Sequence, residues 1–303
     1  MSVTAGDVSE GDLLISGATG MIGGLLVDAL VEREVPLAAM VRPGWDVGRL
    51  ADRPGVKLVE GDFDDPRSME RALRGVGRAF LVTNSSERTE GQQKAFVQAA
   101  QAAGVRHLVK LSQLHASADS PVRFLRYHAA VEAAIEESGV PYTFVRPNLI
   151  LQAYLPFAPM IAAGVLQAPV GEARVSVADA RDIAAVAATA LTEDGHEGRT
   201  YDVTGPAALT HAEIAAAFGD AAGHEVLFQS VPAETFVATL KQTGMPVWQA
   251  EGLAEDYAHY ERGEAAGVSA DVERVTARTA RSVRGFAADY ADAFQRPPQI
   301  GHS

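Results

Sequence analysis

Short apolar runs alternate with longer segments of helical spacing through the first half of the chain. The first segment between two runs places Ile22, Leu26 and Leu30 on one helix face. Strands that alternate with helices at a spacing of about 25 residues predict a parallel sheet with helices on both faces. The runs that predict buried strands are Leu13–Ser16, Pro36–Val41, Val56–Glu60, Ala79–Val82, His107–Leu111 and Tyr142–Val145.

The turn after the first run is rich in glycine. Gly17 suits a tight turn, Gly20 leaves room for a diphosphate to approach the backbone, and Gly23 lets the helix pack close to the strand. The free N–H groups at the start of the helix attract an anion. The alternative is an ordinary glycine-rich turn. The sequence favours a dinucleotide site whose phosphate-binding residues are Gly17, Thr19, Gly20, Met21, Ile22 and Gly23.

The second predicted strand is followed by Arg42, at the position that selects the cofactor. An Asp or Glu there would accept hydrogen bonds from the 2′-hydroxyl of NAD, whereas Arg42 can pair with a 2′-phosphate. The sequence therefore favours NADP (NADPH) as the cofactor. Two alternatives remain: Asp46 as a displaced acid, and Arg42 as a surface residue that only caps the strand.

Residues that follow the other strands are further cofactor candidates, because ligands of such sheets bind at the carboxyl ends of the strands. Asp62 can accept a bond from the adenine amino group, with Phe63 against the ring, or it can cap the helix that begins near Pro66. The sequence leaves both roles open. The candidates are Asp62, Phe63, Thr83, Asn84, Ser112 and Gln113.

The helix expected over residues 121–138 carries the candidate for chemistry. His128 shares one helix face with Phe124, Val131 and Ile135, so it points inward. A histidine that faces a cleft can donate a proton or hold a carbonyl oxygen. The alternative is a core histidine bonded to Glu132, one turn further on, or to a backbone carbonyl.

Beyond Leu151 the regular alternation ends. Residues 154–174 are apolar but contain three prolines, too many for one helix, and we expect a wall or lid over the nicotinamide end. The aromatic residues between 236 and 260 are typical of a small-domain core. Candidate substrate contacts in these regions are Gln152, Tyr154 and Trp248.

The expected fold class is α/β, with two domains. Residues 11–153 and 175–205 are expected to form a doubly wound, parallel-sheet Rossmann domain that binds the cofactor. Residues 154–174 and 206–303 are expected to form a smaller α/β C-terminal domain on the substrate side.

Composition narrows the function classes. The chain has 303 residues and no cysteine, which excludes disulfides, thiolate catalysis and cysteine-ligated metal. A formal net charge of −13 argues against a nucleic-acid partner. No apolar stretch has the length of a membrane span, the first ten residues do not resemble a secretion signal, and the histidines include no close metal-ligand pair. We expect a cytoplasmic protein without a metal, whose partner is a small-molecule acceptor; the oligomeric state is not readable.

Several motifs resemble one family. The turn Gly17–Gly23, which reads GATGMIG, is similar to that of extended and atypical short-chain dehydrogenases/reductases. The pattern His128-x-x-x-Glu132, followed by Ser138–Asn148, narrows the resemblance to the NmrA-like group, which includes NADPH-dependent quinone reductases and azoreductases. The resemblance extends over nearly the whole chain. It implies a Rossmann fold and NADP as cofactor. It also implies that the chain passes along the nicotinamide at Pro147, Asn148 and Leu149.

Reductases of the wider superfamily use a Tyr-x-x-x-Lys pair, on the helix that corresponds to residues 121–138, to protonate the substrate. This chain departs from that pattern at the lysine position. Tyr127 is present, but Val131 stands four residues further on, and residues 121–138 contain no lysine. We therefore expect an oxidoreductase that passes hydride from NADPH to a quinone-like or other conjugated acceptor without that pair. The alternatives are an NADP-binding redox sensor without catalysis and a tailoring reductase in a biosynthetic pathway.

Overall fold

The computed structural model describes residues 12–295, which form two compact units. The first unit contains the chain up to Pro147, together with Ala180–Val203 and Arg274–Ala277. The second contains Asn148–Asp179, Thr204–Glu273 and the chain from Arg278. The polar tail expected over residues 1–11 lies outside the described residues.

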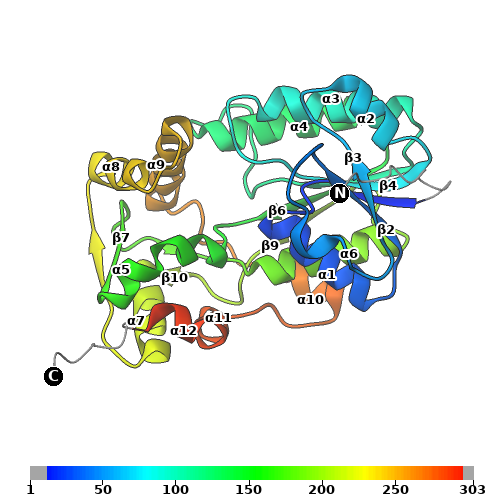
Figure 1. The fold of residues 1–303 in the computed structure, drawn as a ribbon. Helices are drawn as coiled ribbons and strands as arrows, with labels where there is room; N and C mark the ends of the chain where they lie inside the picture. Colours follow the sequence, from blue (N-terminus) through cyan, green and yellow to red (C-terminus); the bar gives the residue numbers. More distant parts are fainter. Residues whose placement is uncertain (1–11, 296–303) are drawn as a thin grey trace. The chain divides into compact units, whose positions relative to one another are not determined.

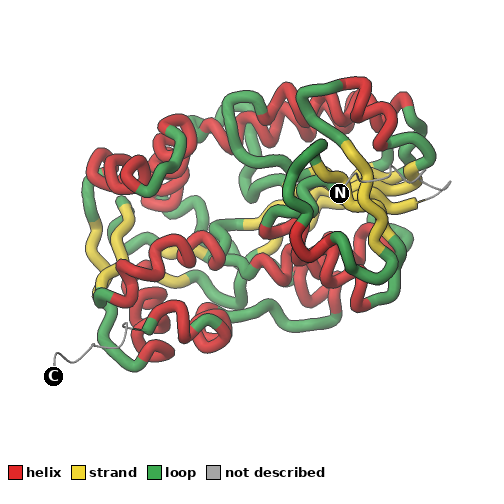
Figure 2. Tube along the Cα trace, viewed as in Figure 1, coloured by secondary structure: helices red, strands yellow, loops and turns green. Residues whose placement is uncertain are grey.

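The first unit is a parallel sheet between two layers of helices (Figures 1 and 2). Within residues 12–295 its strand order is β3-β2-β1-β4-β5-β6-β9, with every pair parallel. The strands are β1 Asp12–Ile15, β2 Leu37–Val41, β3 Val56–Glu60, β4 Val76–Leu81, β5 His107–Leu111, β6 Tyr142–Pro147 and β9 Arg199–Val203. The doubly wound α/β fold expected from the sequence is confirmed.

Helices cover both faces of this sheet. The helices α2 Pro66–Ala72, α3 Thr89–Ala102 and α4 Arg123–Ser138 lie on one face, and α1 Met21–Glu32 and α6 Ala180–Thr192 lie on the other (Figure 1). All five residues of β2 are buried, as expected for a strand covered on both sides. A short 3-10 turn, η1 Gly48–Leu50, connects β2 to β3.

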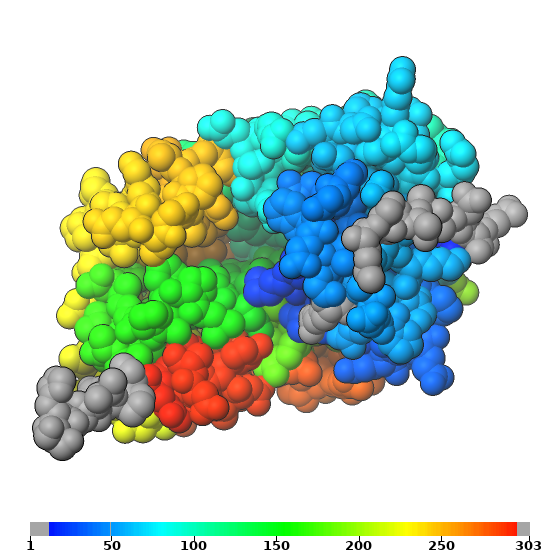
Figure 3. All heavy atoms as spheres, viewed as in Figure 1, coloured from blue at the N-terminus to red at the C-terminus, as the bar shows by residue number. Residues whose placement is uncertain are grey.

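The second unit packs short strands and helices around a core rich in aromatic residues. Phe218 stacks on Phe294 at 4.8 Å between ring centroids, and Tyr257 packs edge-on against Phe236. The helix α12 contacts α5, and in Figure 3 red atoms of the C-terminal helices border green atoms. The elements are η2 Leu151–Phe157, α5 Ala158–Ala162, β7 Val165–Ala168, β8 Arg174–Val175, β10 Leu209–Thr210, α7 His211–Ala222, β11 Leu227–Ser230, α8 Ala233–Gln242, α9 Val247–Glu261, α10 Asp271–Thr276, α11 Val283–Asp289 and α12 Ala291–Phe294. Of these, α10 spans the division between the units.

The division differs from the predicted one at four places, and hydrogen bonds and ring contacts explain why. Residues 148–153 belong to the second unit, where the Asn148 amide donates to Ser176 and to the carbonyl of Ala265. Residues 175–179 belong there too, because Ser176 N–H also donates to Ala265. Residues 204–205 belong to the second unit, where the Ser269 N–H donates to the Thr204 hydroxyl at 2.9 Å. Residues 274–277 belong to the first unit, where the Arg274 guanidinium lies over the Tyr201 ring of β9.

The proline-containing segment 154–174 is not one helix, as predicted; it divides into η2, α5, β7 and β8. Its apolar side chains, including Tyr154, Ile161 and Leu166, lie in the core of the second unit. A role as wall or lid stays a prediction. In residues 12–295, none of the helices combines the length and the apolar character needed to cross a membrane.

Helix α7 begins with a reciprocal pair of hydrogen bonds that offers a test of the fold. The Glu213 N–H donates to the Thr210 hydroxyl at 3.1 Å, and the Thr210 N–H donates to the Glu213 carboxylate at 2.8 Å. Thr210→Ala leaves an N–H at the helix start without its acceptor, which costs about 1 kcal/mol. We expect urea unfolding of the variant to begin at lower concentration, whereas Thr210→Ser retains the hydroxyl and most of the stability. An unchanged alanine variant would contradict the assignment.

Candidate functional site

The glycine turn lies at the carboxyl end of β1 and leads directly into α1. Gly17 has a φ of +60°, and a Cβ added at Gly23 would lie 2.2 Å from the Gly17 carbonyl oxygen. Gly20 caps the start of α1, and the neighbouring residues Thr19 and Met21 are exposed. The N–H groups at this helix start are therefore accessible to an anion, and the turn fits the diphosphate of a dinucleotide.

A serine that sequence reasoning did not single out holds this turn beside β4. The Ser16 hydroxyl donates to the Val82 carbonyl at 3.1 Å and accepts from the Val82 N–H at 2.9 Å. These bonds join the ends of the two central strands, β1 and β4, where the order of the strands reverses. In doubly wound sheets the ligand crevice lies at this point.

Arg42 stands immediately after β2 and is exposed. Its guanidinium carbon lies 3.8 Å from the centroid of the Trp45 ring, so a cation–π contact holds the side chain in place. Within residues 12–295 Arg42 takes part in none of the ion pairs, so its charge is available for a 2′-phosphate. The Asp46 carboxylate accepts from the Gly48 N–H at 2.9 Å and closes its own turn. Sequence reasoning did not identify Trp45 as the support of Arg42.

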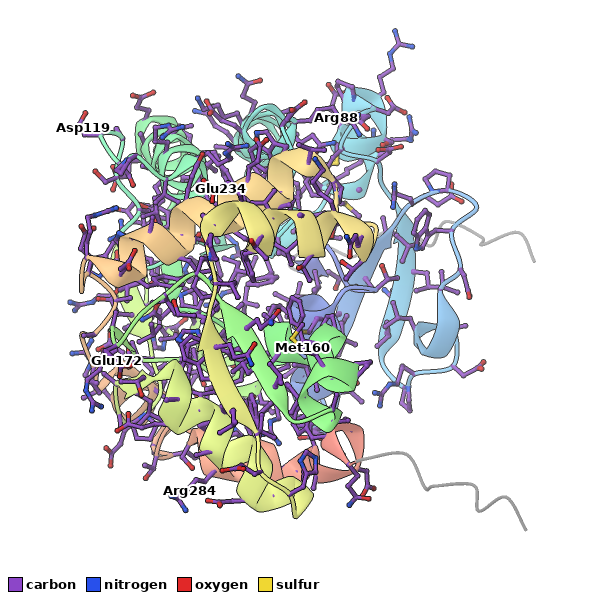
Figure 4. All side chains as sticks on the ribbon, turned by 90° about the vertical axis from the view of Figure 1, so that its left-hand side faces the viewer. Arg88, Asp119, Met160, Glu172, Glu234 and Arg284 are labelled. Carbon is purple, nitrogen blue, oxygen red and sulfur yellow. The ribbon has the colours of Figure 1, made fainter. Side chains whose placement is uncertain are left out.

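A second exposed arginine, Arg88, forms an ion pair with a carboxylate. Arg88, labelled in Figure 4, contacts the Asp64 carboxylate at 2.7 Å, and Gln92 donates to the same carboxylate. The hydrogen bond from Gln92 and the charge of Arg88 lower the pKa of Asp64 below its ordinary value. Arg88 is therefore a weaker candidate for a phosphate contact than Arg42.

The two roles left open for Asp62 are now partly separated. Asp65 caps α2, because its side chain accepts from the Arg67 N–H at 3.0 Å. Asp62 instead accepts from the Asp64 N–H, so of the two roles left open the helix cap is wrong. Phe63 lies 5.8 Å from Phe96, between ring centroids, and is half-buried. Contacts of Asp62 and Phe63 with adenine stay predictions.

Residues at the ends of β4 and β5 already make local hydrogen bonds. The Thr83 hydroxyl accepts from Gln93 at 2.8 Å, and the Asn84 carbonyl accepts from Thr89 at 2.7 Å. The Ser112 hydroxyl donates to Glu132 at 2.5 Å. Their predicted cofactor contacts, and that of Gln113, lie at the expected edge of the sheet and stay predictions.

His128 lies on the inner face of α4 and is 8% exposed. Its Nδ1 atom is 2.8 Å from Nζ of Lys110, a fully buried residue of β5. Glu132 instead accepts hydrogen bonds from Ser112 and Arg146. The alternative of a histidine bonded to Glu132 or to a backbone carbonyl is therefore wrong, and the partner is a lysine.

Burial and nearby charge keep His128 neutral. Desolvation, followed by the charges of Lys110 and Arg146, places the pKa of His128 well below its ordinary value. Because an ammonium group can only donate, Nδ1 is the acceptor and the ring proton lies on Nε2. His128 thus presents a neutral N–H donor rather than an imidazolium.

Lys110 is the functional candidate that sequence reasoning missed. Burial is the largest of the effects that lower the pKa of Lys110 to about 7; Arg146 lowers it further and Glu132 raises it. The available signal was a lysine among the apolar residues Leu108, Val109 and Leu111 of a buried strand. Tyr127, which lacks a helical lysine partner, bonds through its hydroxyl to Ser85 at 2.9 Å.

The residues implied to pass along the nicotinamide begin at the end of β6. Pro147 is buried, and its carbonyl accepts from the Leu114 N–H. The Asn148 side chain makes bonds inside the second unit and also accepts from the Leu149 N–H at 2.9 Å. The amide of Asn148 therefore fixes its own loop, and contacts of these three residues with a cofactor stay predictions.

Two of the three candidate substrate residues lie in buried positions. The Gln152 amide donates to Asp179 at 2.9 Å, and Gln152 is 4% exposed. The Tyr154 hydroxyl contacts Nε2 of His211 at 3.1 Å inside the core of the second unit. These positions argue against substrate contact by Gln152 and Tyr154. Trp248 is half-buried on α9 and stays a prediction.

The described residues do not meet the requirements of a metal site. Among residues 12–295, no three His, Asp or Glu side chains gather in a way that could hold a metal ion.

Comparisons with known proteins agree with this geometry. The model of the NmrA-like family matches residues 9–288. An NAD(P)H azoreductase of Xenophilus azovorans is 40% identical over 93% of this chain and 99% of its own length. An NADPH-dependent quinone oxidoreductase from Escherichia coli, solved in complex with NADPH, is 28% identical with a TM-score of 0.83, covering 91% of this chain and 99% of that one. A triphenylmethane reductase from Citrobacter sp., solved with NADP(H), is 28% identical with a TM-score of 0.83, covering 92% and 100%.

The glycine turn can be tested by filling the space above it. Gly20→Val places a side chain where the diphosphate approaches, while the nearest atom to an added Cβ, the Gly17 carbonyl oxygen, is 3.2 Å away. We expect calorimetry to show loss of NADPH binding and circular dichroism to remain unchanged. The matched control is Gly171→Val, since an added Cβ there meets no atom within 4 Å. Retained NADPH affinity in Gly20→Val would make the turn purely structural.

Proposed function

Because the chain belongs to the NmrA-like family, we propose that it is an NADPH-dependent oxidoreductase that reduces a quinone-like or other conjugated small molecule. One observation carries the proposal: a single edge of one sheet holds both the glycine turn after β1 and His128 beside the end of β5. The named relatives act on azo compounds, quinones and triphenylmethane compounds. These acceptors share an extended conjugated system that accepts a hydride.

The residues of the site divide the task between binding and proton supply. NADPH, when bound, supplies the hydride. The N–H groups at the start of α1 hold the diphosphate, and Arg42 holds the 2′-phosphate. His128 Nε2 donates a hydrogen bond to the oxygen or nitrogen that becomes negative as the acceptor is reduced. The proton of this N–H can then pass to that atom as Nδ1 gains a proton, so the ring stays neutral.

A panel of acceptors tests the proposal. We expect NADPH oxidation with quinones, azo dyes or enones, measured by the loss of nicotinamide absorbance. Tight NADPH binding without turnover of any acceptor would overturn the enzyme assignment and favour an NADP-binding sensor.

Arg42 predicts the preference between cofactors. Arg42→Asp removes the cation and adds an acceptor for a 2′-hydroxyl, so the order of affinity should change from NADPH over NADH to NADH over NADPH. A charge-assisted bond contributes about 1.5–3 kcal/mol, roughly a tenfold to hundredfold change in Kd. Arg284→Asp, an exposed change in the second unit (Figure 4), is the control and should leave both constants unchanged. Equal wild-type affinities for the two cofactors would refute the assignment.

If His128 passes the proton, its substitution should change kcat without changing the affinity for NADPH. His128→Ala should lower kcat with a quinone by about 10²–10⁴ while leaving the Kd of NADPH nearly unchanged, as expected for a positioned acid. His128→Gln retains an N–H donor that does not release a proton. Its KM for the quinone should therefore stay close to that of the wild type, while its kcat should be as low as that of His128→Ala. If both variants turn over normally and only lose thermal stability, His128 is a core residue.

A further inference from the structure

Lys110 occupies an unusual place for a cation. It is the fourth residue of β5, an interior strand of the sheet, and has no exposed surface. Its Nζ donates to the Leu111 carbonyl at 3.0 Å and contacts Nδ1 of His128 at 2.8 Å. Within residues 12–295 these are the acceptors of an ammonium group that carries three N–H bonds, so one proton of the charged form has no acceptor.

The one carboxylate nearby is paired elsewhere. Glu132 accepts from Nε of Arg146 at 3.0 Å, from the second guanidinium nitrogen at 2.5 Å, and from the Ser112 hydroxyl. The charged and titratable groups that face Lys110 are therefore His128 and Glu132 of α4 and Arg146 of β6. Arg146 already compensates Glu132, so the Lys110 charge is the less stabilised member of the cluster.

His128 connects Lys110 to the accessible side of the site. Nδ1 is taken by Lys110, and Nε2 forms no hydrogen bond within the part of the chain that the structure describes. Nε2 is also not one of the fully covered side-chain atoms that lack a partner in that part. Nε2 therefore keeps some exposed surface, and the imidazole ring lies between that surface and the buried ammonium of Lys110.

We propose that Lys110 is the proton source of the reaction and that it acts through His128, a relay that rests on the proposed reductase function. A lysine from the sheet would thereby supply the proton that the absent Tyr-x-x-x-Lys pair would otherwise provide.

The relay balances in protons and electrons. Hydride transfer reduces a quinone by two electrons to the hydroquinone monoanion and oxidises the nicotinamide. The Nε2–H bond of His128 breaks as that proton joins the anionic oxygen, and an Nζ–H bond of Lys110 breaks as its proton joins Nδ1. The products are hydroquinone, neutral His128 with its proton on Nδ1, and neutral Lys110. After release, a proton from the bulk solution joins Nε2, and Nδ1 returns its proton to Lys110, so each turnover consumes one proton from solution.

The direction of the pH dependence follows from the lysine. The pKa of Lys110 is lowered to about 7, mainly by burial. Protonated Lys110 is the competent form, so kcat/KM with a quinone should be constant at low pH and fall as the pH rises through about 7. The neutral ring of His128 contributes no change in charge over this range.

A pair of acceptors separates the relay from hydride transfer. Menadione requires a proton after hydride transfer, whereas the cation of malachite green becomes neutral on taking a hydride and requires none. We expect Lys110→Met to lower the menadione rate by about tenfold to a thousandfold more than the malachite green rate. Lys110→Arg keeps a donor to Nδ1 but does not release its proton at these pH values, so it should resemble Lys110→Met. Lys94→Met, at an exposed ion pair with Glu90, is the control and should leave both rates unchanged.

Nitrogen NMR of the cofactor-free protein provides a readout that does not depend on activity. We expect Lys110 Nζ to lose its proton near pH 7 and the His128 ring to carry its proton on Nε2, with this tautomer preference weakened in Lys110→Met. Thermal unfolding and the Kd of NADPH establish that each variant is folded.

Each result decides between the two proposals. A wild-type-like menadione rate in Lys110→Met overturns the relay, and a wild-type-like Lys110→Arg reduces Lys110 to a positioning residue. A Lys110 that stays charged up to pH 10 also overturns the relay. If the wild type reduces neither acceptor, the reductase function fails, and the NMR titration still decides whether the Lys110–His128 pair shares a labile proton.

Discussion

The close approach of α1 to the end of β1 fixes the geometry on which the candidate site depends. An added Cβ at Gly23 would overlap the Gly17 carbonyl oxygen, so the helix packs on the turn at a distance that only glycine permits. The first N–H groups of α1 are held beside the central strands as a consequence. Ser16, bonded to Val82 across the two strands, keeps the turn from shifting along the sheet.

In the polar cluster of α4, β5 and β6, the desolvation that destabilises a buried cation also makes that cation a stronger acid. Two cations, Lys110 and Arg146, and one anion, Glu132, are brought together with limited access to water. A buried cation that is not matched by an anion is destabilised relative to water, and it lowers this cost by releasing its proton readily. The same destabilisation that weakens the folded state makes Lys110 an acid of suitable strength near neutral pH.

The fold and the glycine turn could be predicted because their signals are local in sequence. Strand length, helical spacing and the positions of Gly17, Gly20 and Gly23 are all contained within short windows. The contact between Lys110 and His128 could not be predicted in this way, since it joins a strand to a helix through packing that no periodicity describes. Asp65, three residues after Asp62, caps α2, and the exact start of a helix is not set by a local pattern. Tyr154 illustrates a further limit, because an apolar segment has the same pattern whether it lines a cavity or fills a core.

The order in which the chain completes the first unit has a consequence for its synthesis. The edge of β6 is covered by β9, and α1 packs against α6, yet both covering elements follow Asn148–Asp179 of the second unit. On the ribosome, the first 147 residues emerge before Ala180–Val203 exists, with an unpaired strand edge and an uncovered helix face. A fragment that ends at Pro147 would keep the whole glycine turn. It would leave the β6 edge unpaired and the α1 face uncovered, so we expect a nascent chain of this length to aggregate unless chaperones bind it.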